Sequence, residues 1–262
     1  MKLGVVLESM GLTFRTGLPQ AARLGVGGVQ VDAVGDLAPD RLTDTGRREL
    51  RNLLKTFDQS VTALNLPLRR GLDNPENLQP RLEYMRAVMN LAFELGARTV
   101  IAPCPKLPGV GEEARANLIR ESLLDLGRHG DRVGTVLALE IGLDSPEAVR
   151  DYLEPFDVGS LKVNYDPANL LVSGFDPVKG VLPLHRRIAH VHARDARKSA
   201  VSRGAQEVAL GAGDVDWLGL IATLAASEYR GWVVVKRETS EDKVKDVERG
   251  VAFLRRVMVP GG

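Results

Sequence analysis

Residues 134–140 read GTVLALE, a short apolar run that begins at a glycine and ends in a carboxylate. Apolar, β-branched runs of this length are typical of buried strands. Similar runs recur along the chain, and the segments between them show helical periodicity, as in 82–95. Regular alternation of strands and helices predicts a parallel α/β fold. The expected strands are 2–7, 27–32, 60–65, 98–103, 134–140, 159–165, 187–193 and 231–236.

Eight strands, each followed by a helical segment, match one (β/α)8 barrel, whose usual length is about 250 residues. The chain has 262 residues, and no linker or low-complexity stretch divides it. Glycines in the stretches ARLGVGG and FELGART are placed to end helices in a left-handed turn. We therefore predict an α/β fold that forms a single TIM barrel domain over residues 1–262.

The composition narrows the range of partners. The 35 basic and 34 acidic residues leave a formal net charge of +1, which gives no electrostatic case for nucleic acid or an anionic membrane. Cys104 is the single cysteine, so an intrachain disulfide is excluded and a reducing compartment is indicated. The sequence has no signal-peptide pattern and no apolar stretch of ~20 residues. We expect a cytoplasmic protein that acts on a small molecule and is either a monomer or a homo-oligomer.

Four chemically active residues stand at or just beyond the ends of consecutive predicted strands. Glu140, Asp166 and His192 are each separated by 26 residues, which is one strand–helix repeat, and Lys236 ends the last strand. The βα loops of a barrel gather at one mouth, so these side chains are expected to converge there. Two carboxylates and an imidazole form a ligand set suited to Mn, Mg, Zn or Co.

Each residue also has a plainer interpretation. Glu140 is as readily a solvated loop residue or a helix cap, and Asp166 could simply cap the turn in PANLL. A lone histidine such as His192 is more often a hydrogen-bonded core residue than a ligand. The shared spacing on three consecutive strands favours the metal or catalytic interpretation.

Several motifs resemble those of a known family. VNYDPANL, RIAHVHARDA, LGAGDVDW and YRGWVVV are similar to motifs of the xylose-isomerase-like sugar phosphate isomerase/epimerase family, a TIM-barrel superfamily that also contains apurinic endonucleases. The resemblance implies one divalent metal held by a glutamate, an aspartate, a histidine and a second glutamate on strands five to eight. Glu140, Asp166 and His192 match the first three positions. In the family's epimerases the two glutamates transfer the proton.

The fourth position departs from the family, because Lys236 stands where the second glutamate is expected. An ammonium has no lone pair for a metal and repels a cation. Three outcomes are open: Lys236 replaces the metal as counter-ion of Glu140 and Asp166, Glu238 supplies the missing oxygen instead, or Lys236 extends to solvent. We favour the first, so divalent metal is expected to bind weakly or not at all.

Two further departures are consistent with a changed or lost activity. Ala212 in LGAGDVD and Gln30 in GVQVD stand where relatives commonly carry acidic residues. Glu140 is then the surviving base, and Lys236 is a second catalytic candidate if burial depresses its pKa.

The remaining candidates are expected to bind substrate. Asn169 and Arg194 lie near the expected mouth, as does Glu238, and the loop after the third strand carries Arg69 and Arg70, which suit a phosphate or carboxylate. Arginine pairs of this kind are more often solvated. Separately, Asp195 is expected either to orient the His192 imidazole or to pair with Arg194 or Arg197.

Three functional classes follow. The first is a sugar or sugar-phosphate isomerase or epimerase that transfers a proton next to a carbonyl, with its metal site altered by Lys236. The second is a non-catalytic or metal-free barrel that binds a sugar or polyol. The third, a DNA-repair endonuclease, is disfavoured because a three-zinc cluster needs many histidines and this chain has four. Its near-neutral charge also argues against binding along a duplex.

Overall fold

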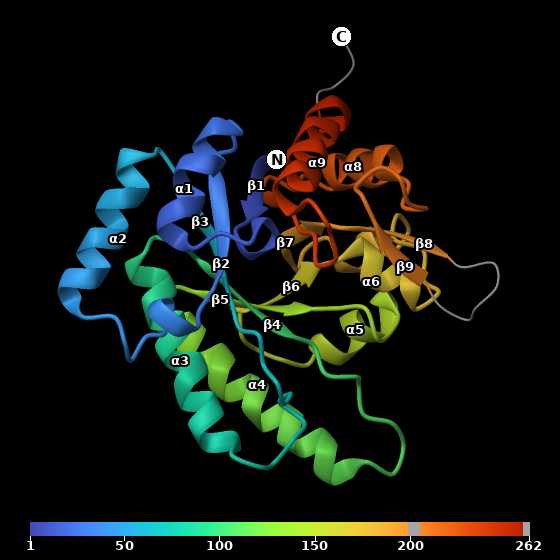
Figure 1. Cartoon of the computed structure of the whole chain (residues 1–262). Helices are drawn as coiled ribbons and strands as arrows, with labels where there is room; N and C mark the ends of the chain where they lie inside the picture. The colour runs from blue at the N-terminus through green and yellow to red at the C-terminus, as the bar shows by residue number, and fades with distance from the viewer. Residues whose placement is uncertain (199–204, 259–262) are drawn as a thin grey trace.

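Eight parallel strands close into a barrel in the computed structural model, which describes residues 1–198 and 205–258 (Figure 1). The hydrogen-bonded order around the barrel is β1-β10-β7-β6-β5-β4-β3-β2. The barrel strands are β1 (Lys2–Val6), β2 (Gly28–Asp32), β3 (Ser60–Asn65), β4 (Thr99–Pro103), β5 (Val136–Glu140), β6 (Leu161–Tyr165), β7 (Ile188–Ala193) and β10 (Trp232–Val235). The predicted single (β/α)8 fold is confirmed, and each expected strand overlaps an observed one.

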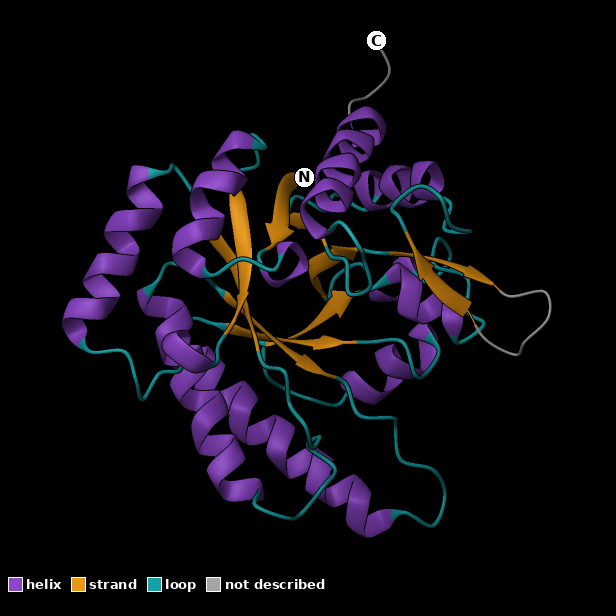
Figure 2. Ribbon diagram, viewed as in Figure 1, coloured by secondary structure: helices purple, strands orange, loops and turns teal. Residues whose placement is uncertain are grey.

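Helices surround the strands on the outside of the barrel (Figure 2). Two glycines, Gly25 and Gly96, follow helices with φ of +66° and +78°, the left-handed conformation predicted from their positions. The helices are η1 (Glu8–Met10), α1 (Phe14–Arg23), η2 (Gly35–Leu37), α2 (Asp44–Thr56), α3 (Leu78–Glu94), α4 (Glu113–Val133), α5 (Pro146–Leu153), α6 (Pro167–Val172), α7 (Val181–Leu184), α8 (Trp217–Ala226) and α9 (Lys243–Met258). Over the described ranges, none of them combines the length and apolarity needed to span a membrane.

The main hydrophobic core is formed by residues of the strands and of the surrounding helices. A second, small cluster comprises Ala63, Ile101 and Ala138, on β3, β4 and β5. Polar residues of the barrel strands are also buried, namely Gln30, Thr62, Thr99, Asn164, His190 and His192. Buried polar groups are costly unless they are hydrogen-bonded, so the strands carry a polar network as well as a core.

A two-stranded antiparallel hairpin follows β7 and was not predicted from the sequence. It consists of β8 (Asp195–Lys198) and β9 (Ala205–Val208). Each strand has only four residues, too few to show a distinct alternation of polar and apolar side chains. The hairpin lies beside α6, at the carboxyl-terminal end of β7 where the candidate site is expected.

Candidate active site

Four neighbouring strands deliver the predicted residues to one rim. Glu140 is the last residue of β5, Asp166 directly follows β6, His192 lies near the end of β7, and Lys236 directly follows β10. These strands are adjacent in the barrel in the order β5, β6, β7 and β10. The register places Val234 opposite His192 and Glu140 opposite Asn164. The carboxyl-terminal ends of these strands therefore bring the four residues together.

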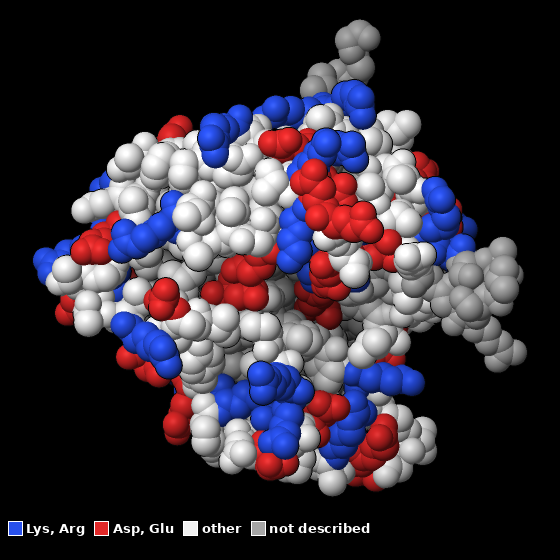
Figure 3. All heavy atoms as spheres, in the orientation of Figure 1, with Lys and Arg blue, Asp and Glu red and all other residues white. Residues whose placement is uncertain are grey.

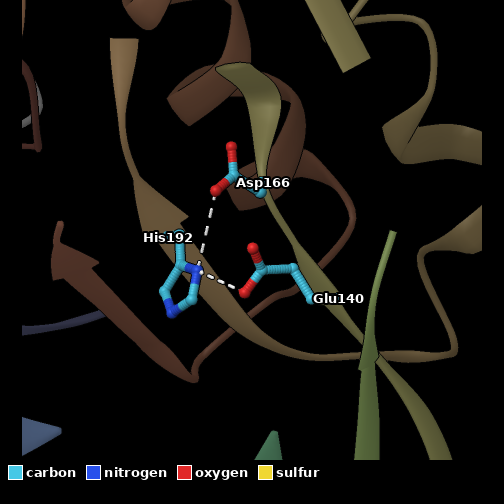
Figure 4. A group of neighbouring side chains, drawn as sticks. All are labelled: Glu140, Asp166 and His192. Carbon is cyan, nitrogen blue, oxygen red and sulfur yellow. Dashed lines mark ion pairs between the residues drawn. The ribbon is translucent and has the colours of Figure 1, made fainter. Parts of the chain in front are cut away.

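The two carboxylates and the imidazole form a compact group (Figure 4). One potential ligand atom from each of Glu140, Asp166 and His192 lies within 4.8 Å of the others. The Nδ1 atom of His192 is 3.2 Å from Glu140 Oε2 and 3.7 Å from Asp166 Oδ2. Asp166 also caps α6, since its Oδ1 accepts the backbone N–H of Asn169 at 3.0 Å. Asp166 thus caps α6 with one carboxylate oxygen while the other faces the cluster.

Hydrogen bonds inside the barrel orient His192. Its Nε2 is 2.8 Å from Gln30 Oε1, so Nε2 donates and Nδ1 is left with a lone pair when the imidazole is neutral. The side-chain amide of Asn164 lies 2.9 Å from His192 Nδ1 and 3.2 Å from Glu140 Oε2. The Asn164 carbonyl oxygen is 2.9 Å from His190 Nδ1. Burial is the main cause that holds the pKa of His190 well below its usual value, so His190 is neutral.

Lys236 binds Glu140 through an ion pair. Its Nζ lies 3.0 Å and 3.4 Å from the two oxygens of Glu140 and 3.2 Å from Glu238 Oε1. Burial opposes ionisation of Lys236, but the carboxylates of Glu140, Asp166 and Glu238 outweigh it and raise the pKa of the ammonium. Burial likewise opposes ionisation of Glu140, but His192 and Lys236 hold its pKa well below the usual range. Both groups are therefore charged at neutral pH.

The donor set fits a divalent metal at three positions. The Asp166 side chain is fully buried, and its Oδ2 lacks a hydrogen-bond partner among the described residues, although the Arg194 guanidinium lies 3.7 Å from it. A buried carboxylate oxygen in this state is suited to a cation, and His192 Nδ1 faces the same space. Lys236, paired with Glu140, brings a positive charge and no lone pair to the edge of this group.

A network around Arg194 joins the cluster to the hairpin. Arg194 donates to Asn169 Oδ1 at 2.8 Å, to Glu207 Oε1 at 3.1 Å and to Glu238 Oε2 at 3.0 Å. Asn169 in turn donates to Glu140 Oε1 at 3.2 Å. Glu207, on β9, also accepts the backbone N–H groups of Glu238 and Thr239. The hairpin therefore holds Arg194 and Asn169 in place beside Glu140.

Arg69 and Arg70 lie apart from this cluster. Both are exposed, and Arg70 forms an ion pair with Glu76 at 2.7 Å on the same loop. Neither bonds to the Glu140 cluster within the described part of the chain. Their assignment to a substrate phosphate stays a prediction.

Neither expectation for Asp195 is correct. Its carboxylate accepts the backbone N–H groups of Gly211 and Gly213 at 2.9 Å and 3.2 Å and the indole N–H of Trp217 at 3.1 Å. A Cβ on Gly213 would lie 2.0 Å from Asp195 Oδ1, which explains the glycine. Asp195 is three residues beyond His192, so strand alternation directs it to the opposite face. Its role is to anchor the loop that leads from the hairpin to α8.

Two acidic residues of the rim were missed. Glu8 directly follows the first predicted strand, and Asp32 ends the second. Glu8 Oε1 accepts the backbone N–H of Asp32 at 2.8 Å, and the Asn65 amide donates to Asp32 Oδ1 at 2.7 Å. Burial is the largest influence on both carboxyl groups and raises the pKa of Glu8 to about 7. Inspecting the ends of the first three strands, as was done for the last four, would have identified these residues.

Two cavities open on the rim. One of about 250 Å³ is lined by Glu140 and Asn169 together with apolar residues such as Leu143 and Val172. The other, of about 350 Å³, is lined by Glu8 and Asp32. Figure 3 shows acidic side chains around a hollow on this face of the molecule. The site thus combines buried charge with space for a small molecule.

Residues 18–257 match the family model described as xylose isomerase-like TIM barrel. The chain belongs to this family. The resemblance seen in the DPANL and HVHARD motifs is therefore confirmed.

Individual similarities are more distant. An inosose dehydratase of Clostridium tetani is 28% identical over 123 residues, which is 42% of this chain and 41% of that protein. The aligned region thus spans less than half of this relative. A xylose isomerase domain protein from Planctomyces limnophilus has a TM-score of 0.86 and 24% identity, covering 98% and 96% of the two chains. D-psicose 3-epimerase from Clostridium cellulolyticum, solved with D-tagatose, has a TM-score of 0.80 and 14% identity over 98% and 99%. These structural likenesses show the shared fold.

Proposed function

We propose that the protein is a sugar-modifying enzyme of the isomerase or epimerase type. It would move a proton at the carbon next to the carbonyl of a sugar or sugar phosphate. One observation carries the proposal: the ionised Glu140 lies 3.0 Å from the Lys236 ammonium on the rim. Proton abstraction beside a carbonyl needs a base and a positive group that stabilises the enediolate oxygen, and this pair supplies both.

Glu140, Asp166 and His192 would hold a divalent metal such as Mn, Zn, Mg or Co, which would polarise the substrate carbonyl when bound. Lys236 occupies the position of a fourth ligand and adds charge of the same sign as the metal. We therefore propose that the metal binds weakly or not at all, with Lys236 acting as the counter-ion of Glu140.

The protein side chains divide the remaining tasks. Glu140 is ionised and accepts the proton from carbon. Lys236 donates an N–H to the oxygen on which negative charge develops. Asn169 lines the same cavity as Glu140 and is held by Arg194, so it is placed to bind a substrate hydroxyl. Glu238 pairs with both Lys236 and Arg194 and offsets the repulsion between the two cations.

Glu140→Gln tests this function. Exchange of the proton next to the carbonyl would be followed by NMR in D2O, using a panel of ketoses, cyclitol ketones and their phosphates. Removing a general base should slow exchange by at least about 100-fold. Glu83→Gln, at an exposed position on α3, is the matched control and should exchange at the wild-type rate. Full exchange by Glu140→Gln would place the base elsewhere.

A metal-free sugar-binding barrel is the alternative. Its support is that both carboxylate oxygens of Glu140 already accept hydrogen bonds, from Lys236, Asn164 and Asn169. Donors of this kind reduce the basicity of a carboxylate. Calorimetric binding of a sugar without exchange by the wild-type protein would establish this alternative in place of the enzyme.

A further inference from the structure

The cavity of about 250 Å³ beside Glu140 has a mostly apolar wall. Leu143, on the loop after β5, and Val172, the last residue of α6, both line it. These two residues are 60% and 50% exposed, and large apolar side chains are more often buried. Two of them beside one cavity indicate a surface that the apolar part of a ligand covers.

The segments that form this wall are fastened to one another. The Cys104 backbone N–H donates to the carbonyl oxygen of Glu140 at 3.0 Å. Farther along the loop after β4, the Leu107 N–H donates to Asp144 Oδ2 at 2.8 Å. Gly142 packs so closely on α6 that a Cβ there would lie 2.4 Å from a side-chain atom of that helix. The wall is therefore formed before a ligand binds, and a preformed wall can select between ligands.

Among the described residues, no lysine or arginine lines the cavity. Apart from the Cys104 thiol, its polar side chains are those of Glu140, Asn169 and Ser173. A phosphate bound here would be repelled by the Glu140 carboxylate and would find no counter-ion on the wall. The cavity is thus suited to an uncharged group.

The basic residues beyond the cavity wall do not supply this counter-ion. Lys236 is paired with Glu140 at 3.0 Å, and Arg194 is paired with Glu207 at 3.1 Å. Lys106 is exposed on the loop after β4 but does not line the cavity. The pattern of charges therefore favours a substrate without a phosphate.

We propose that this cavity binds the terminal carbon of an unphosphorylated 6-deoxy sugar, with the methyl group against Leu143 and Val172. The inference rests on the proposed function, because the carbonyl end of the same sugar would lie at Glu140. A terminal hydroxyl between the two apolar side chains would lose water without gaining a partner, which is costly. A methyl group in the same place is favoured by its burial.

The affinity of the wild-type protein for matched sugars tests this inference. Titration calorimetry would compare D- and L-ketohexoses with their 6-deoxy analogues and their 6-phosphates. We expect the 6-deoxy form to bind at least about tenfold more tightly than its parent ketohexose, and the 6-phosphate to bind more weakly than the parent. Binding of the parent, the phosphate or a cyclitol ketone at least as tightly as the 6-deoxy sugar would overturn the inference and leave the proposed function intact. If no sugar or cyclitol ketone binds, the proposed function fails as well.

Variants of the wall locate the selectivity. Val172→Thr and Leu143→Asn each replace apolar atoms by polar ones of similar size, and each should lower the ratio of 6-deoxy to parent affinity by at least about threefold. Leu143→Met keeps the wall apolar and should retain the wild-type ratio. Leu218→Asn is the control, because Leu218 is 67% exposed on α8 and does not line this cavity. An unchanged ratio in both Val172→Thr and Leu143→Asn would overturn the inference.

Discussion

Lys236 places an ammonium directly beside the Glu140 carboxylate. A divalent cation and an ammonium ~4 Å apart repel by roughly 8 kcal/mol at an effective dielectric of about 20, an upper figure because the side chain can move. The carboxylates of Glu140 and Glu238 hold this side chain at 3.0 Å and 3.2 Å, so moving it would break two ion pairs. The same contacts offset the repulsion between the clustered carboxylates, as does Arg194, whose guanidinium lies 3.7 Å from Asp166 Oδ2.

Lys236→Glu should increase the affinity for Mn²⁺ or Zn²⁺, because it removes the repulsion and completes the ligand set. We expect at least about 100-fold tighter binding, equivalent to roughly 2.8 kcal/mol, measured by titration calorimetry.

Lys236→Gln is the control for charge alone and should have an intermediate affinity. Equal affinities of the wild type and Lys236→Glu would contradict the prediction and mean that Lys236 turns away when metal enters.

At the scale of elements, the β8–β9 hairpin links the end of β7 to the site. Glu207 on β9 bonds to Arg194 and to the backbone after β10. Asp195 on β8 fastens the following loop through backbone N–H groups and the Trp217 indole. The hairpin is therefore connected both to Arg194, beside the Glu140 cluster, and to the helix that follows.

Asp195→Ala should lower the free energy of unfolding by about 2–4 kcal/mol, because it leaves several buried N–H donors without an acceptor. Urea denaturation would measure the loss. Asp195→Asn retains one acceptor oxygen and should lose less stability. A loss below about 1 kcal/mol for the alanine variant would show that water replaces the carboxylate.

At the scale of the whole molecule, ionised carboxyl groups at the rim lower the free energy of unfolding. Glu8 is exposed at the rim, but desolvation of its carboxyl group there raises the pKa to about 7 from an ordinary value of about 4.3. The native state therefore binds more protons than the unfolded state between these values, and the contribution of Glu8 to stability falls as pH rises through this window. Such a cost is common where a function requires a perturbed group.

Glu8→Gln should accordingly be more stable than the wild type at pH 8, by on the order of 1 kcal/mol after allowance for the exposure of Glu8. Below about pH 4.5 the difference should vanish, because the carboxyl is protonated in both states. Urea unfolding at the two pH values is the measurement. An unchanged difference across the range would exclude Glu8 ionisation as its cause.

The sequence alone determined the barrel and the placement of Glu140, Asp166, His192 and Lys236. Apolar runs alternating with helical periods specify strands and helices locally, and the closure of eight parallel strands brings their ends to one mouth. Spacing along the chain therefore sufficed for residues that share the same position in successive repeats.

Only the tertiary structure decided the partners of those residues. The bonds of Lys236 to Glu140, of Gln30 to His192 and of Arg194 to Glu207 join positions between 13 and 162 residues apart. Side-chain direction at the end of a strand depends on local turns, which is why Asp195 faces away from the site while Glu8 lines the rim. The raised pKa of Glu8 comes mainly from desolvation of its carboxyl group at the rim, which is established only when the whole chain has folded.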